Sequence, residues 1–214
     1  MKVIYSLVLL SMLICCKDED VVFLPQVGQA PIVDGLQEDL WLKTQPHSLF
    51  FYYGQKAEDS LDFSATYRVV QHNENMFFLV SVYDQIKYTH QKPTERHDLE
   101  LWNPAHYDRV NLEFLREDND TDKFAISLNY GLDSVFATNI SPTDFKAIVS
   151  DTPLGYNVEF MIPLRLIRSD IITFNLWITD HDKRFHREGL DVFGVQESTY
   201  GSGGRYRKSL SLEE

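Results

Sequence analysis

Alternation of hydrophobic and polar residues is the dominant pattern along this chain. Residues 63–71 and 76–84 alternate on either side of the turn-forming stretch "HNEN", which predicts a β-hairpin. The same period of two recurs in segments 108–115, 123–130, 156–164 and 172–180. The stretch "GSGG" (201–204) predicts a flexible turn before a last strand over 205–212.

Short alternating strands separated by turn signals predict an all-β fold. We expect an antiparallel two-sheet β-sandwich, immunoglobulin-like or jelly-roll-like, with at most short helical turns. Pro163 should end its strand or lie at an edge, and 163–167 should form one helical turn. Segment 85–106 is a long loop, of the kind that often carries function in sandwiches.

The N-terminus has the pattern of a secreted protein. Lys2 precedes an apolar run over 3–14, which is too short to span a bilayer but suits a signal peptide. "LICC" resembles the lipobox of bacterial lipoproteins, with Cys16 as the lipidated residue, although cleavage before Cys15 or an ordinary secretory signal is also open. We therefore expect a signal peptide over 1–15, a lipidated acidic tether over 16–28 and a single domain over 29–214.

The net charge limits the class of binding partner, and the cysteine content limits how the domain can be stabilised. The net charge is −12 without a long basic run, which excludes nucleic acid as an expected partner because phosphate backbones reward clustered positive charge. The only cysteines are Cys15 and Cys16, so the domain is expected to be stabilised by packing rather than by disulfides.

Six ordered segments carry a resemblance to a known family: "PIVDGLQEDLW", "MFFLVSVYD", "YDRVNLEF", "GYNVEFMIPL", "ITFNLWITDHD" and "FGV". Together they resemble carbohydrate-binding module family 9, within the wider DOMON-like sandwiches. In the opening segment, Asp34-Gly35 predicts a tight turn with positive φ at Gly35, and Trp41 is expected in the core.

The resemblance implies a non-catalytic module that holds a sugar between two aromatic rings. The positions expected to carry those rings do not match, but Trp102 and Tyr107 lie nearby in sequence. Alternation along its strand places Trp177 on the face of the sheet that points away from the core. We therefore expect Trp177 to stack a sugar while Asn111, Glu113, Asn175 and Ser127 share its face, or else Trp177 to fill a second small core under a loop.

Metal binding and other functions remain open at this point. Asp84, Asp180 and Asp182 end strands where the resemblance implies structural calcium, although strand-end carboxylates also satisfy turns. The alternatives are a DOMON-like haem or redox protein, which needs axial His or Met, and a glycoside hydrolase, which needs two carboxyl groups across a cleft.

The expected setting follows from the tether and the resemblance. The acidic stretch after Cys16 looks like the tag of surface-exported lipoproteins in glycan-degrading bacteria. We expect an outer-membrane lipoprotein that binds oligo- or polysaccharide close to polysaccharide-degrading enzymes.

Overall fold

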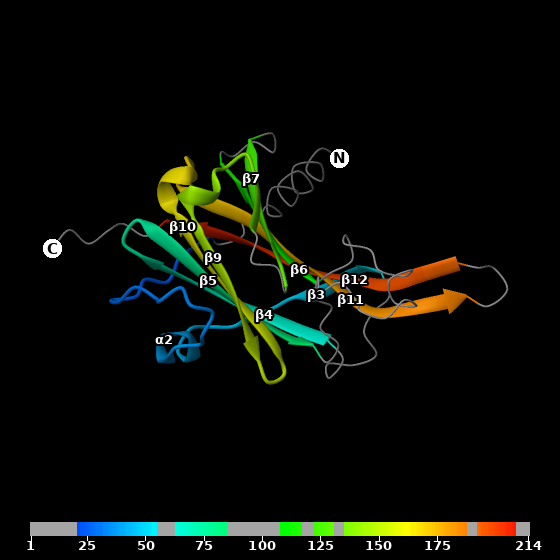
Figure 1. Cartoon of the computed structure of the whole chain (residues 1–214). Coiled ribbons are helices and arrows are strands. Elements are labelled where there is room, and N and C mark those ends of the chain that lie inside the picture. Colours follow the sequence, from blue (N-terminus) through cyan, green and yellow to red (C-terminus); the bar gives the residue numbers. More distant parts are fainter. Residues whose placement is uncertain are drawn as a thin grey trace, which may run out of the picture.

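The computed structural model describes residues 21–54, 63–84, 108–116, 122–130, 135–187 and 192–208. For 52–54, 181–187, 192–198 and 200 it describes the backbone alone. The chain folds into two β-sheets that pack face to face, as Figure 1 shows, which confirms the predicted all-β sandwich.

The larger sheet has seven strands in the order β1-β12-β11-β6-β7-β8, with β3 also pairing with β12. Its strands are β1 (Val22–Phe23), β3 (Phe50–Gly54), β6 (Arg109–Leu115), β7 (Lys123–Asn129), β8 (Val135–Thr138), β11 (Ile171–Arg187) and β12 (Val192–Arg207). All pairs are antiparallel except β1 with β12. The ends of β11 and β12 project from the sandwich as a long hairpin (Figure 1).

The smaller sheet has five strands in the order β2-β4-β5-β10-β9. Its strands are β2 (His47–Ser48), β4 (Phe63–His72), β5 (Asn75–Asp84), β9 (Lys146–Thr152) and β10 (Gly155–Pro163). The described helical segments are α2 (Asp39–Leu42), η2 (Pro142–Asp144) and η3 (Leu164–Leu166). The predicted β4–β5 hairpin, the strand end at Pro163 and the helical turn after it are all present.

The main core lies between the sheets and is rich in aromatic rings. Phe78 of the five-stranded sheet meets Phe174 of the seven-stranded sheet edge to face, with ring centroids 5.0 Å apart. Phe114 stacks on Phe124 at the same separation. Each of these four side chains is at most 1% exposed, as alternation along the strands predicts.

Two segments differ from the sequence prediction. Residues 201–204 are not a flexible turn but part of β12. Glycine is needed at 204 because the rings of Phe174 and Tyr206 pack against its backbone. A Cβ at this position would lie 2.8 Å from both rings. The predicted tether over 16–28 is part of the sandwich from Val22 on, since β1 pairs with β12 and Leu24 is 1% exposed.

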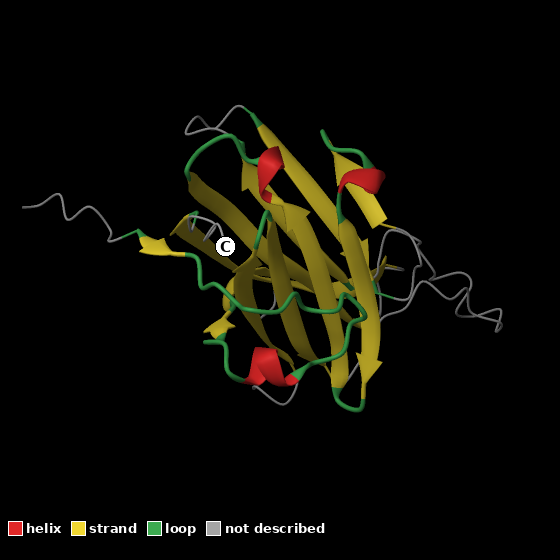
Figure 2. Ribbon diagram, turned by 90° about the vertical axis from the view of Figure 1, so that its left-hand side faces the viewer, coloured by secondary structure: helices red, strands yellow, loops and turns green. Residues whose placement is uncertain are grey.

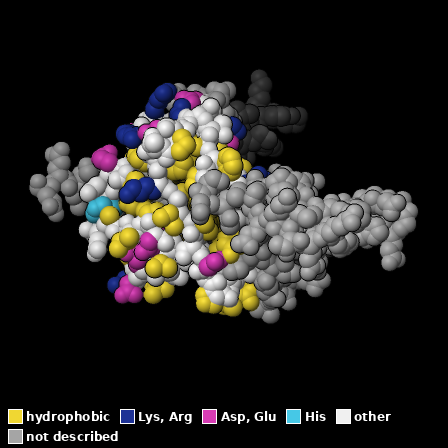
Figure 3. All heavy atoms as spheres, viewed as in Figure 1, with side chains coloured by type: hydrophobic (Ala, Val, Ile, Leu, Met, Phe, Trp, Pro, Cys, Tyr) yellow, Lys and Arg dark blue, Asp and Glu magenta, His cyan; other side chains and the backbone are white. Residues whose placement is uncertain are grey.

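The segment around α2 covers the outer face of the five-stranded sheet (Figure 2). Trp41 is fully buried there against Val70, Phe77 and Leu79, which confirms its predicted core position. On the face seen in Figure 3, hydrophobic side chains are interspersed with charged ones. Within the described ranges, no helix is long and apolar enough to cross a bilayer.

Candidate functional site

The outer face of the seven-stranded sheet collects the polar residues that alternation turns away from the core. Along β11 the core-facing row is Ile172, Phe174, Leu176 and Ile178, each at most 1% exposed. The intervening residues Asn175 and Trp177 therefore point outward, where Asn175 is exposed and Trp177 half-buried.

Cross-strand register brings the five predicted face residues together. Trp177 lies opposite Asn111 of β6, and Asn111 lies opposite Ser127 of β7. In the next row, Asn175 lies opposite Glu113. Because directly opposed residues in antiparallel strands share a face, the five form two adjacent rows, as the sequence predicts.

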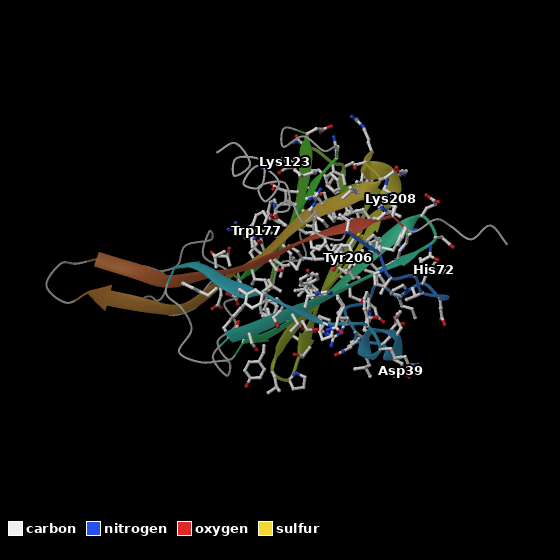
Figure 4. The ribbon with its side chains drawn as sticks, turned by 180° about the vertical axis from the view of Figure 1, so that it is seen from behind. Asp39, His72, Lys123, Trp177, Tyr206 and Lys208 are labelled. Carbon is white, nitrogen blue, oxygen red and sulfur yellow. The ribbon has the colours of Figure 1, made fainter. Side chains whose placement is uncertain are left out.

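A hydrogen bond and an ion pair fix several side chains of these rows. The Ser127 hydroxyl donates to Asn111 Oδ1 at 2.6 Å, while Asn111 Nδ2 has no hydrogen-bond partner within the described structure. Glu113 Oε2 pairs with Lys123 Nζ at 2.9 Å. Lys123 was not predicted from the sequence, although its place at the start of β7 puts it on the same face (Figure 4).

A hollow of about 540 Å³ lies beside Trp177, within the size range of small-molecule sites. Its lining comes from the β11–β12 pair: Asn175, Leu176, Trp177, Thr199, Gly201 and Ser202. We call it the Trp177 hollow. The contribution of β12 was not predicted, because the glycines of 201–204 indicate a turn in the sequence. The register of β12 shows instead that Gly201 lies opposite Trp177, so the residue beside the indole ring on this strand contributes no side chain.

The remaining predicted contact residues are not placed. Trp102 and Tyr107 lie outside the described residues, as do Cys16 and the side chain of Asp182. The structure adds a further row to this face. In it, Arg109 lies opposite Thr179 on one side and opposite Asn129 on the other. Asn129 is fully buried, and neither of its amide atoms has a hydrogen-bond partner within the described structure.

A second cluster lies between the two sheets, at one end of the core. Asp84 ends the core-facing row of β5, Asp180 continues that of β11, and Asp108 immediately precedes β6. All three are at most 2% exposed, and one carboxylate oxygen from each lies within 4.8 Å of the others. The sequence predicted Asp84 and Asp180 for this cluster but not Asp108, whose only sign was its position before a buried strand.

The buried phenol of Tyr156 lies close enough to the aspartate cluster for the three charges to act on it. This side chain is 1% exposed, and its hydroxyl has no hydrogen-bond partner within the described structure. Burial, followed by the charges of Asp108, Asp84 and Asp180, raises the pKa of Tyr156. Three carboxylates and a phenol form an all-oxygen donor set, which is the chemistry that Ca²⁺ prefers.

Glu159 lies on the opposite side of the molecule from Glu113. It is 1% exposed on the outer face of the five-stranded sheet, where its Oε1 accepts from Trp41 Nε1 at 2.9 Å. Its Oε2 accepts from the backbone N–H groups of Asp34 and Gly35 at 2.9 and 2.7 Å. Burial raises the pKa of Glu159 while these three donors lower it, and the net shift is upward.

This arrangement explains the opening segment of the domain. Gly35 has φ 79°, as predicted, and a Cβ there would lie 2.4 Å from the Cβ of Ser150. The turn therefore packs directly on β9, and its backbone N–H groups donate to Glu159. Because the sandwich separates Glu113 from Glu159, these two carboxyl groups cannot flank one substrate.

The comparison with protein families decides what this sandwich is. The family described as carbohydrate family 9 binding domain-like matches residues 33–203. The chain belongs to this family. No curated protein matches the chain.

Solved structures agree on the fold. The chain is similar to a carbohydrate-binding module family 9 protein from Caldicellulosiruptor kristjanssonii in complex with glucose, with a TM-score of 0.65 and 14% identity, over 90% of this chain and 97% of that one. A complex of such a module from the same organism with cellotriose has a TM-score of 0.61 and 16% identity, over 90% and 99% of the two chains. At this identity the likeness establishes the family 9 sandwich and no more.

Proposed function

We propose that this protein is a non-catalytic carbohydrate-binding module whose ligand lies on the outer face of the seven-stranded sheet. The observation that carries the proposal is the Trp177 hollow, in which a half-exposed indole stands beside rows of amide, hydroxyl and carboxylate groups. Sugars suit such a surface because their C–H faces stack on aromatic rings while their hydroxyls need hydrogen-bond partners. Family relatives solved with glucose and cellotriose support this ligand class.

The role of each group follows from its position. Trp177 stacks against one face of a sugar ring, and Asn175, which is exposed and adjacent, bonds its hydroxyls. Asn111, which is 4% exposed, lies opposite Trp177, and the bond from Ser127 holds its side chain in place beneath the ligand face. Glu113 and its partner Lys123 supply an acceptor and a donor at the next row.

The other candidate functions have less support. Glu113 and Glu159 lie on opposite outer faces, which disfavours the carboxyl pair that a glycoside hydrolase requires. For haem, Met76 is fully buried in the main core and Met161 packs against the cluster around Trp41. Neither methionine is positioned as an axial ligand.

We further propose that Asp84, Asp108 and Asp180 hold a structural calcium ion, with the Tyr156 hydroxyl beside it. Two oxygens bound to one Ca²⁺ at 2.3–2.6 Å are at most about 5 Å apart, which agrees with the 4.8 Å limit in this cluster. Calcium would tie β5 to β6 and β11 across the sandwich. It would thereby fix the strands that carry Asn111 and Trp177.

The setting we propose is that of a lipoprotein. Acylation of Cys16 would anchor the module to the outer membrane, exposed at the surface and close to polysaccharide-degrading enzymes. Only four residues separate Cys16 from the first described residue at 21, so the anchor would hold the sandwich near the membrane. Globomycin treatment, which blocks lipoprotein signal cleavage, should leave an unprocessed precursor, whereas secretion of a soluble form would contradict the anchor.

A glycan array with the purified protein tests the function itself. We expect binding to one class of oligo- or polysaccharide, and weaker binding after Trp177→Ala. Absence of binding across an array that includes cello-, xylo- and manno-oligosaccharides, with and without calcium, would overturn the proposal.

A further inference from the structure

We propose that the ligand is an oligosaccharide rather than a single sugar, because a second subsite adjoins the Trp177 hollow at the β3 edge of the seven-stranded sheet. This inference rests on the proposed function and specifies its ligand class. Phe50 forms the wall of the second subsite.

Register places Phe50 in the same cross-strand row as Trp177. Gly201 of β12 lies opposite Trp177 on one side and opposite Phe50 on the other. The Cα atoms of the two aromatic residues are therefore two strand spacings apart, about 10 Å. Phe50 is 69% exposed, more than any other large apolar side chain that the structure describes on a strand.

A hollow of about 430 Å³ opens beside Phe50, and we call it the Phe50 hollow. It lies where β12 runs between its pairing with β3, which ends at Gly201, and its pairing with β1, which starts at Tyr206. Its lining combines apolar side chains with hydrogen-bonding groups: Val22, His47, Ser48, Phe50, Arg205 and Tyr206.

The floor of the Phe50 hollow is a polar network built on aromatic side chains. His47 stacks on Tyr67 with ring centroids 5.0 Å apart, and its Nε2 lies 3.4 Å from the Tyr206 hydroxyl. Tyr67 bonds in turn to Ser202 and Tyr206. Burial lowers the pKa of His47 and so favours the neutral ring, which offers one donor and one acceptor. Arg205 and Ser48 are exposed at the rim.

The lining of the Phe50 hollow suits the same class of ligand as the Trp177 hollow. Phe50 offers a flat apolar face for sugar C–H groups, while the imidazole, hydroxyl and guanidinium groups can bond sugar hydroxyls. A purely apolar partner would cover the exposed rim groups of Arg205 and Ser48 without offering them hydrogen-bond partners, which costs free energy. Carbohydrate is therefore the ligand that the whole lining favours.

The two hollows meet at β12. Ser202 lines both, and the residues that face outward on either side of it, Gly201 and Gly203, have no side chains. Figure 4 shows Trp177 nearer the projecting hairpin and Tyr206 farther along the sandwich. A chain of linked sugars can therefore run from the first hollow into the second across a floor of glycine backbone.

The experiment measures how binding affinity depends on ligand length, with and without the Phe50 side chain. Dissociation constants for mono-, di- and trisaccharides of the gluco-, xylo- and manno-series are measured by calorimetry for wild type, Phe50→Ala, Trp177→Ala and Phe136→Ala. Phe136 is the matched control, because it is 55% exposed on β8, opposite Ser127 at the far end of the same row. Melting temperatures check that each variant folds.

We expect wild type to bind the trisaccharide about 3- to 10-fold more tightly than the monosaccharide, the gain from one added aromatic contact. Phe50→Ala should remove this gain and leave monosaccharide affinity unchanged, whereas Phe136→Ala should change neither. Equal affinity for all lengths in wild type, or a length effect that survives Phe50→Ala or is lost in Phe136→Ala, would overturn the second subsite alone. Failure of wild type to bind any sugar, or Trp177→Ala binding as wild type does, would overturn the proposed function itself.

Discussion

Replacement of Asp108 by Asn should make the protein insensitive to calcium. Carboxylate oxygens of Asp84, Asp108 and Asp180 lie within 4.8 Å of one another, and charges at that separation repel by about 3 kcal/mol per pair at an effective dielectric constant near 20. Three such pairs give about 10 kcal/mol, comparable with the whole stability of a domain. A bound Ca²⁺ ion would offset that repulsion, and the neutral amide introduced by Asp108→Asn would weaken the hold of the cluster on the ion.

The assay is thermal unfolding in calcium and in EDTA. At a free calcium concentration one hundred times the dissociation constant, binding adds about 2.7 kcal/mol, which for a domain of this size raises the melting temperature by about 5–11 °C. Asp108→Asn should lose this shift yet melt no lower than wild type in EDTA, because it also removes one repelling charge. Asp144→Asn is the matched control, since Asp144 is partly exposed and paired with Arg165.

Two results would refute this reasoning. Wild type could melt at the same temperature in calcium and in EDTA, or Asp108→Asn could retain the full calcium shift. Magnesium serves as a specificity control, because its shorter bonds and strict octahedral geometry suit this cluster poorly.

Three further predictions concern the scaffold and the face. Glu159→Gln should lower the free energy of unfolding in urea by about 2–4 kcal/mol, since an amide has one acceptor for the donors of Asp34, Gly35 and Trp41. Because the pKa of Glu159 is raised, its carboxyl favours folding below the ordinary value near 4.5 and loses this contribution as the pH rises through the folded-state pKa. The stability difference between wild type and Glu159→Gln should therefore be larger at pH 4 than at pH 7. Gly201→Val should fold, because a Cβ there meets its nearest neighbours at 3.5 and 3.6 Å, but should weaken oligosaccharide binding in calorimetry by obstructing the floor between the hollows.

Most of the sandwich could be predicted because each strand buries one face. Alternation in 108–115 and 172–180 turned Val110, Leu112 and Phe174 inward and left Asn111 and Trp177 outward, as the structure has them. The same rule could not identify β12, because Gly201, Gly203 and Gly204 carry no hydrophobic pattern. Their place in a strand depends on rings that pack from distant parts of the chain, such as Phe174 against Gly204.

The candidate sites were predictable only where a single strand held the information. Trp177 and Asn175 are two residues apart on β11, so parity alone places them on one face. Asp108 joined Asp84 and Asp180 through the packing of two sheets, which no local pattern records. Phe50 could not be predicted as a binding residue from its neighbours in sequence. Its place beside Trp177 depends on the pairing of β3 with β12 at Gly201.

The most direct test of the central claim is the affinity of Trp177→Ala for the glycan that binds wild type most tightly. Loss of the stacking contact should weaken binding at least about ten-fold, corresponding to about 1.4 kcal/mol, without lowering the melting temperature in calcium by more than a few degrees. Calorimetry that finds wild-type affinity in a folded Trp177→Ala protein would contradict the assignment of the binding face.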